Sequence, residues 1–291
     1  MLIWQVDFYR HPQNNADSVV LWDLLICDTH SKNSDRESTG NFSCDRFRYE
    51  SSCPQSQANS TWLASEFQKA SQKPNSGGLP NIIQVFRPQS LSLIQAAVKN
   101  LITNLNNSNI KIEVEATRRT PALKQWLQEK GYSPIIDKPP PLPLPDNLWG
   151  EEWRFGTLPA GDITEFINRP IPIRDVPDFL LPMNLGLAST QAVPGIVIYG
   201  GRRSMFLARW LQEVKPVTLN YIAGAPDGLV LEAGLTDRWI VATFEGEEIA
   251  IAARNYEQRK LESRGLHFLL VQPDDSEMTY TGFWLLQRED I

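Results

Sequence analysis

The 291-residue chain is long enough for about two domains, since a typical domain contains roughly 100 to 200 residues. Its hydrophobic content of 42% is typical of a folded protein, and its formal net charge of −6 excludes a generally basic nucleic-acid binder. Any nucleic-acid site must therefore be a local basic patch. The apolar runs are broken well short of the roughly 20 residues that span a bilayer, so we expect no integral membrane segment.

The N-terminus and the cysteines indicate a protein of a reducing compartment. The chain begins MLIWQVDFYRHP, without the charged and apolar regions of a targeting peptide, which predicts a cytoplasmic location. Cys27, Cys44 and Cys53 lack CxxC spacing. They predict neither a zinc site nor a disulfide framework, and we interpret them as small core residues.

The first 137 residues change from a strand pattern to an alternation of helices and strands. Segments with alternating or continuous apolar residues predict strands at 2–10, 19–28 and 47–54. The following periodicities predict helix 57–70, strand 82–86, helix 90–102, strand 110–116 and helix 120–131. The polar span 30–45 is predicted to be a long surface loop. The order βββαβαβα matches the ribonuclease H-like fold, in which the first strand pairs in parallel with the fourth.

A proline-rich stretch separates this half from a second one. Residues 138–160 are predicted to be an extended linker between domains at 1–137 and 161–291. Five segments of the second half predict strands, at 195–200, 218–224, 228–234, 238–244 and 267–273, and a last strand covers 281–286. Helices are predicted at 204–214 and 246–264, the latter ended by Gly265. The second domain is therefore a mixed-sheet α/β domain.

Two helices begin with the same basic pair. Residues 118–130 read RRTPALKQWLQEK and residues 202–214 read RRSMFLARWLQEV, with Thr120 and Ser204 as expected N-caps. The free amides of a first helical turn attract anions, and adjacent guanidinium groups add bidentate donors for phosphate. Candidate phosphate-binding residues are Arg87, Arg118, Arg119, Arg202 and Arg203. Ion pairs with surface carboxylates remain the structural alternative.

Catalytic patterns are incomplete throughout the sequence. A two-metal nuclease needs several convergent carboxylates; Asp7 and Glu66 are candidates, but the strand 82–86 leads into Arg87 where an acid is required. Asp227 and Glu232 faintly resemble a restriction-endonuclease-like pattern, but its acid-x-Lys element is missing. If that fold is present, it lacks a complete catalytic site.

Neither nucleophilic nor nucleotide chemistry is indicated. His11, His30 and His267 are accompanied by no GxSxG or Cys/His signature. The short GGRR segment at 200–203 lacks the length and lysine of a P-loop. We therefore predict a non-enzymatic protein with no catalytic residues, no metal and no cofactor.

A family resemblance adds to this reading. The ordered motifs are WQVDFYR, CPQSQANSTWL, VFRPQ, RRT, GLVLEAGLTDRWIVATF, GLHFLLVQPDDS and GFWLL. With them the chain resembles the Tab/Atab RNA-binding proteins of oxygenic phototrophs, and without a presequence it resembles a cyanobacterial member. The resemblance implies a role in translating a photosystem I reaction-centre messenger and in photosystem biogenesis. It also implies an essential Trp-Leu-Leu motif, which maps onto Trp284, Leu285 and Leu286.

The arginines and the resemblance lead to one functional hypothesis. The five candidate arginines bind phosphates of the 5′ region of a messenger RNA, and Trp4, Trp149 and Trp153 are available to stack on bases. Ribosomal or photosystem-assembly proteins are possible further partners, DNA is not expected, and peripheral association with thylakoid membranes is compatible with this role. A protein-interaction scaffold and a residual metal-dependent nuclease are the alternatives. The Trp-Leu-Leu motif has its own alternative, a last strand that completes the core.

Overall fold

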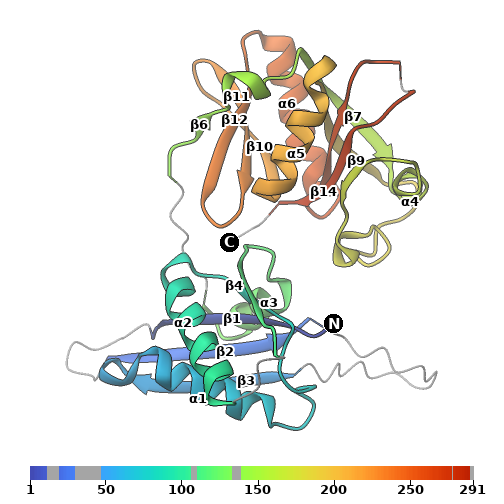
Figure 1. Ribbon diagram of the computed structural model, residues 1–291. Coiled ribbons are helices and arrows are strands. Elements are labelled where there is room, and N and C mark those ends of the chain that lie inside the picture. Colours follow the sequence, from blue (N-terminus) through green and yellow to red (C-terminus); the bar gives the residue numbers. More distant parts are fainter. Residues whose placement is uncertain (12–19, 30–46, 106–109, 133–138, 277, 289–291) are drawn as a thin grey trace. The chain divides into compact units, whose positions relative to one another are not determined.

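The computed structural model describes residues 1–11, 20–29, 47–105, 110–132, 139–276 and 278–288. The chain divides into two compact units, Met1–Pro134 and Ile135–Ile291 (Figure 1). Its described residues form three sheets together with helices, so the α/β class predicted from the sequence is confirmed. The predicted loop at 30–45, Cys44 and His30 lie outside the described residues.

The first unit is a five-stranded sheet in the order β3-β2-β1-β4-β5. Its strands are β1 (Ile3–Arg10), β2 (Leu21–Asp28), β3 (Arg48–Pro54), β4 (Ile82–Val85) and β5 (Glu113–Ala116). β1 pairs antiparallel with β2 and parallel with β4. The parallel pairing that the ribonuclease H-like order requires is therefore present, while the assignment to that fold stays a prediction.

Helices cover both faces of this sheet. They are α1 (Ser60–Ser71), α2 (Pro88–Asn104) and α3 (Pro121–Glu129), preceded by the short helix η1 (Gln55–Gln57). Asn59 caps α1 by accepting the amide hydrogens of Thr61 and Trp62. The main core lies between the sheet and the α1–α2 pair, and α3 lies on the other face (Figure 1). Cys27 and Cys53 are buried, as expected of core residues.

The second unit contains two sheets. One has the order β7-β9-β13-β14-β8 and the other β10-β11-β12-β6. The strands are β6 (Leu142–Pro143), β7 (Glu152–Pro159), β8 (Ile173–Asp175), β9 (Ala192–Tyr199), β10 (Pro216–Ile222), β11 (Asp227–Ala233), β12 (Asp237–Phe244), β13 (Leu266–Gln272) and β14 (Gly282–Gln287). The helices are η2 (Asp146–Leu148), α4 (Ala160–Ile167), η3 (Asp178–Leu180), η4 (Gly201–Arg203), α5 (Ser204–Val214) and α6 (Glu247–Glu262).

The proline-rich stretch is part of this second unit and not a free linker. β6 pairs in parallel with β12, and β7 pairs antiparallel with β9 along its whole length. Prolines are tolerated in these strands because both lie at sheet edges, where one row of backbone amides needs no partner. Composition predicted an extended chain correctly, but only the pairing shows where that chain packs.

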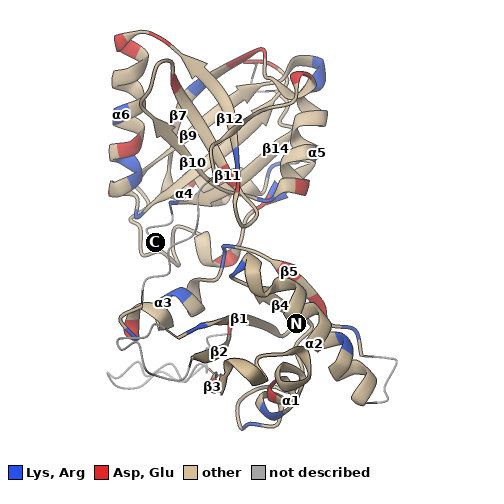
Figure 2. Ribbon diagram, turned by 90° about the vertical axis from the view of Figure 1, so that its left-hand side faces the viewer, with Lys and Arg blue, Asp and Glu red and all other residues tan. Residues whose placement is uncertain are grey.

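Helix α6 ends at Glu262, two residues before the predicted end at 264, with Ser263 as its C-cap. Gly265 adopts a φ of +80°, which favours glycine, and its amide donates to the Lys260 carbonyl oxygen at 2.6 Å. Acidic and basic residues are interspersed along α6 (Figure 2). The two acids of its first turn and the two basic residues of its last turn are oriented favourably with respect to the helix dipole.

Candidate nucleic-acid interface

Arg87, the residue that precedes α2, is held by other side chains of the first unit. Its Nε donates to Asp7 Oδ1 at 2.7 Å, and its Nη2 donates to the Tyr132 hydroxyl at 3.0 Å. The guanidinium carbon also lies 4.9 Å from the Tyr9 ring centroid and 5.5 Å from that of Tyr132. This mostly buried cation is neutralised by its carboxylate partner, so it offers little charge to a phosphate.

Asp7 is fully buried beside this arginine. Burial raises the pKa of its carboxyl to about 6, although the Arg87 charge and hydrogen bond act in the opposite direction. Asp7 forms an ion pair with Arg87 at 2.7 Å. A guanidinium thus occupies the place where a metal-dependent nuclease would bind a cation.

Glu66, the second candidate acid, lies on the opposite face of the sheet. It is buried on α1, where it accepts hydrogen bonds of 2.6 Å from both the Tyr49 hydroxyl and Lys69 Nζ. Burial would raise the pKa of this carboxyl, but the hydrogen bonds from Lys69 and Tyr49 outweigh burial and lower it. Trp4, Val6 and Phe8 of β1 face α1, so the alternation of the strand directs Asp7 away from Glu66. The two acids do not form one site.

The first arginine pair precedes α3 in a corner that is filled by protein groups. Arg118 is fully buried, with 0% exposure, and Arg119 is half-buried. Thr120 occupies the N-cap position as predicted, but its side chain makes no capping hydrogen bond. Instead, the side chain of Gln5 on β1 accepts the Leu123 amide hydrogen at 3.1 Å. A phosphate cannot reach Arg118 in this arrangement. One amide of the first turn of the helix, that of Leu123, already has a hydrogen-bond acceptor within the protein.

The second pair lies in η4, immediately before α5, and is exposed. Arg202 and Arg203 are solvent-accessible, and Arg203 Nη1 makes a 3.4 Å hydrogen bond to the Asp146 carbonyl oxygen. The amides of Gly200 and Gly201 donate to the carbonyls of β13 and its following residue. Ser204 is the first residue of α5 and not its cap. The sequence repeat therefore has two different environments, one buried and one accessible.

The two pairs belong to different units. Arg87, Arg118 and Arg119 lie in the first unit, and Arg202 and Arg203 lie in the second. The two segments contain similar residues because each forms an amphipathic helix that packs its Leu and Trp side chains inward. Exposure, which decides whether a guanidinium can meet a ligand, differs between them because the preceding residues pack differently.

The tryptophans proposed for stacking are mostly part of the cores. Trp4 is fully buried, and its ring stacks on Phe47 with centroids 5.8 Å apart, so it cannot stack on a base. Trp149 and Trp153 are partly buried against the core of the second unit. Trp149 Nε1 also donates to the Leu144 carbonyl oxygen at 3.1 Å. Sequence composition overestimated their availability because tryptophan is usually largely buried.

The Trp-Leu-Leu motif forms the centre of β14. Trp284, Leu285 and Leu286 each have 0% exposure. Trp284 and Leu286 belong to the core shared with α5 and α6, and Leu285 belongs to the core on the other face of the sheet. The Trp284 ring lies over Gly282, where any Cβ would collide with it. The motif completes two cores at once, as the structural alternative predicted.

The remaining candidate residues of the sequence have structural partners. Asp227 accepts the Tyr221 hydroxyl at 3.0 Å and the Gly224 amide at 2.9 Å, and Glu232 pairs with Arg238 at 3.5 Å. His11 contacts Asp23 at 2.6 Å. His267 is buried; its Nε2 accepts the Leu219 amide at 2.9 Å and its Nδ1 lies 2.8 Å from the Gly265 carbonyl oxygen. Among the described residues, no group of three His, Cys, Asp or Glu is arranged to hold a metal ion.

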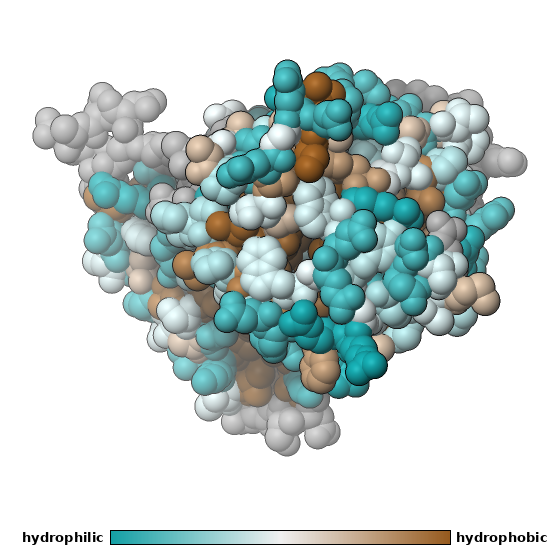
Figure 3. All heavy atoms as spheres, turned by 90° about the horizontal axis from the view of Figure 1, so that it is seen from above, coloured by the Kyte–Doolittle hydropathy of each residue, from teal (hydrophilic) through white to brown (hydrophobic). Residues whose placement is uncertain are grey.

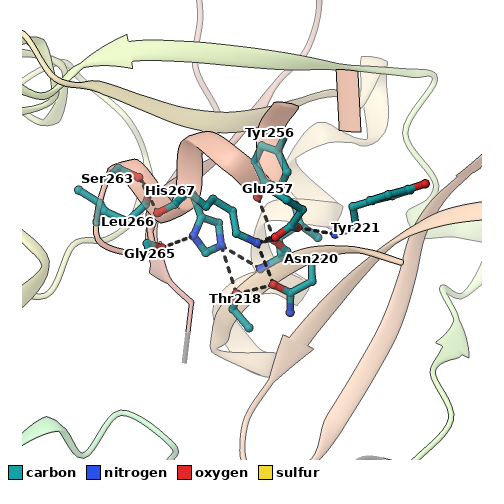
Figure 4. Close-up of polar contacts among 11 residues, drawn as sticks. Thr218, Asn220, Tyr221, Tyr256, Glu257, Ser263, Gly265, Leu266 and His267 are labelled. Atoms are coloured by element: carbon teal, nitrogen blue, oxygen red, sulfur yellow. Dashed lines mark hydrogen bonds and ion pairs between the residues drawn. The ribbon is translucent and has the colours of Figure 1, made fainter. Parts of the chain in front are cut away.

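A buried lysine is the polar feature that sequence reasoning missed. Lys260 on α6 has 0% exposure, and its Nζ donates to the Leu219 carbonyl, Asn220 Oδ1 and Glu257 Oε1 at 2.8 to 2.9 Å. Figure 4 labels two of these acceptor residues, Asn220 and Glu257. Burial lowers the pKa of this ammonium group to about 8. The spacing of Ala253, Tyr256 and Lys260 along one helix face was the available signal, since the first two are buried.

We expect Lys260 to make stability depend on pH. The folded pKa of about 8 lies below the ordinary value of 10.5, so the unfolded chain binds more protons between these values and stability rises with pH in that window. The gain is about 3 kcal/mol at most. Urea unfolding at pH 7.5 and pH 10 should show this rise in stability in the wild type but not in Lys260→Met. In that variant the Leu219 carbonyl, Asn220 Oδ1 and Glu257 Oε1 each still accept a hydrogen bond from another group. Identical pH slopes in the two proteins would contradict this assignment.

The surface of the second unit is otherwise mixed. Seen from above, hydrophilic and hydrophobic residues alternate over one of its faces without separating into two regions (Figure 3). In the described parts of the chain, no helix is both long and apolar enough to cross a membrane. The accessible arginines before α5 are therefore a local cationic feature on a mixed surface.

The fold defines a two-unit α/β protein whose second unit carries two accessible arginines before α5. Residues 3–130 match the family model described as RNA-binding protein Tab2/Atab2 N terminal, and residues 132–287 match that of the Tab2/Atab2 C-terminal domain. The chain therefore belongs to the Tab2/Atab2 family of RNA-binding proteins.

Curated relatives agree with this membership. The chain is 27% identical to a protein named TAB2 homolog, chloroplastic, from Arabidopsis thaliana, over 97% of this chain and 74% of that protein. It is 26% identical to a protein of the same name from Zea mays, over 97% of this chain and 70% of the relative. No solved structure matches the chain significantly. The boundary between the two family models falls at residues 130–132, close to the division between the two compact units.

Proposed function

We propose that this protein binds RNA without cleaving it and supports translation of a photosystem I reaction-centre messenger. The observation that carries the proposal is that both domains of an RNA-binding family match one chain in order, over residues 3–130 and 132–287. The messenger-specific role follows the family resemblance of the sequence motifs. A cytoplasmic location, with peripheral association at thylakoid membranes and contacts to ribosomal or assembly proteins, belongs to the same proposal.

The side chains of the first unit support a non-catalytic role. Two-metal hydrolysis needs convergent carboxylates that are free to bind cations. Here Asp7 pairs with Arg87, and Glu66 pairs with Lys69 on the other face of the sheet. To reach Asp7, a cation would have to displace the Arg87 guanidinium.

Filter binding tests RNA binding and cleavage together. The full-length protein and a labelled 5′ segment of a photosystem I reaction-centre messenger are incubated at 50 and 200 mM salt, with and without Mg²⁺. We expect retention that weakens with salt, because phosphate contacts release counterions, and an intact RNA in both divalent conditions. Absence of retention would favour a protein-interaction scaffold. If the wild type produces Mg²⁺-dependent RNA fragments and the Asp7→Asn variant does not, the protein is instead a nuclease.

Ribosome occupancy tests the messenger-specific part. In a host that lacks this protein, we expect fewer ribosomes on the photosystem I reaction-centre messenger at unchanged messenger level, and restoration by the wild-type gene. Unchanged occupancy together with unassembled photosystem subunits would place the function after translation.

A further inference from the structure

The exposed face of α5 carries an aromatic ring, with one arginine on the helix and another just before it. Leu207, Ala208 and Leu211 are buried on one side of this helix. At 100° per residue, Phe206 and Arg209 lie on the opposite side, three residues apart, as does Glu213. Arg202 is exposed in η4, just before the helix. We call Arg202, Phe206 and Arg209 the α5 stripe. Phe206 has 61% exposure, which is unusual for a phenylalanine in a folded protein.

The cations of the α5 stripe are not neutralised by neighbouring side chains. Within the described parts of the chain, Arg202 and Arg209 form no hydrogen bond or ion pair. Arg87 and Arg238, in contrast, both contact carboxylates. In a protein with a net charge of −6, two uncompensated guanidinium groups around an accessible ring form a distinctive surface.

Acidic residues limit this surface at both ends. The Glu151 carboxylate lies against Gly201, just before the stripe, and Glu213 lies four residues after Arg209 in the last turn of the helix. A polyanion is therefore attracted to the middle of the stripe and disfavoured at its ends. This arrangement suits a short contact with one or two nucleotides better than a long electrostatic groove.

We propose that the α5 stripe binds single-stranded RNA, with a base stacked on Phe206 and the adjacent phosphates on Arg202 and Arg209. An exposed ring can stack on a base of any identity, whereas in a duplex the faces of internal bases are already covered by their neighbours. The stripe therefore selects unpaired over paired RNA. The inference rests on the proposed RNA binding. It adds the class of RNA, which is single-stranded, and the residue that distinguishes unpaired from paired RNA, which is Phe206.

Fluorescence anisotropy with two defined probes tests the α5 stripe. The full-length protein is titrated into labelled oligo(U) of 20 nucleotides and into a labelled 20-base-pair RNA duplex. Phe206→Leu is expected to weaken oligo(U) binding about tenfold with an unchanged salt slope, and Phe206→Trp is expected to retain wild-type binding. Arg209→Gln is expected to reduce the salt slope by about 0.7. Duplex binding should be weaker than oligo(U) binding in the wild type and should change little in Phe206→Leu.

Matched controls separate the stripe from general effects. Leu261→Ala removes an apolar side chain with 53% exposure from α6, and Arg254→Gln removes an exposed charge from the middle of the same helix. Both should bind oligo(U) within about twofold of the wild type, and melting curves should show all variants folded. If wild-type protein binds oligo(U) but Phe206→Leu matches Leu261→Ala, the stripe is refuted while RNA binding stands. If the wild type binds neither probe nor the messenger segment, both proposals are overturned.

Discussion

Replacing Leu285 by alanine is expected to destabilise the second unit by about 2–5 kcal/mol. The side chain is fully buried in the core on one face of the β7-β9-β13-β14-β8 sheet, and its removal leaves a cavity that the neighbouring strands β13 and β8 restrain from collapsing. Urea unfolding monitored by tryptophan fluorescence measures the loss. Leu261→Ala, on the exposed side of α6, should cost less than about 1 kcal/mol.

The same variant decides how the Trp-Leu-Leu motif acts. If the motif is a folding element, the folded fraction of Leu285→Ala at low temperature binds RNA with wild-type affinity, and binding is lost only along the unfolding curve. An intact melting curve combined with lost RNA binding would show that the motif contacts RNA or a partner directly. Complete burial of Trp284, Leu285 and Leu286 favours the first outcome, because no ligand can touch them in the folded unit.

Replacing Arg87 by alanine is expected to destabilise the first unit by about 3–5 kcal/mol, because Asp7 then remains as an uncompensated buried charge. The double variant Asp7→Asn/Arg87→Met should recover most of this loss, since neither an acid nor a cation is then buried. Arg48→Ala breaks a more exposed ion pair with Glu129 and should cost less than about 1 kcal/mol. Equal losses for Arg87→Ala and Arg48→Ala would contradict this account of the buried pair.

The Asp7 carboxyl also sets a pH dependence of stability. Its folded pKa of about 6 lies above the ordinary value of 3.8, so the folded chain binds more protons between these values. The contribution of this group therefore falls as pH rises from about 4 to 6. Urea unfolding of wild type and Asp7→Asn across this range should diverge in that direction, and Arg87→Ala should show a steeper slope because the remaining acid then has no cationic partner.

Much of the fold follows from local sequence patterns. Alternating apolar residues in β1, the helical period of α1 and the glycine after α6 are decided by short-range physics, so the sequence predicts them. The failures are of another kind. Residues 138–160 read as a spacer because proline composition reports extended backbone and does not report the strand with which that backbone pairs.

The candidate site shows the same division more sharply. The sequence by itself determined that two arginine pairs precede two similar helices, and that the chain carries the motifs of an RNA-binding family. Only the tertiary structure decided that Arg118 is buried, that Arg87 is paired with an acid from β1, and that Phe206 is exposed. Burial and pairing depend on residues far apart in the chain, such as Asp7 and Arg87, and no local pattern contains them.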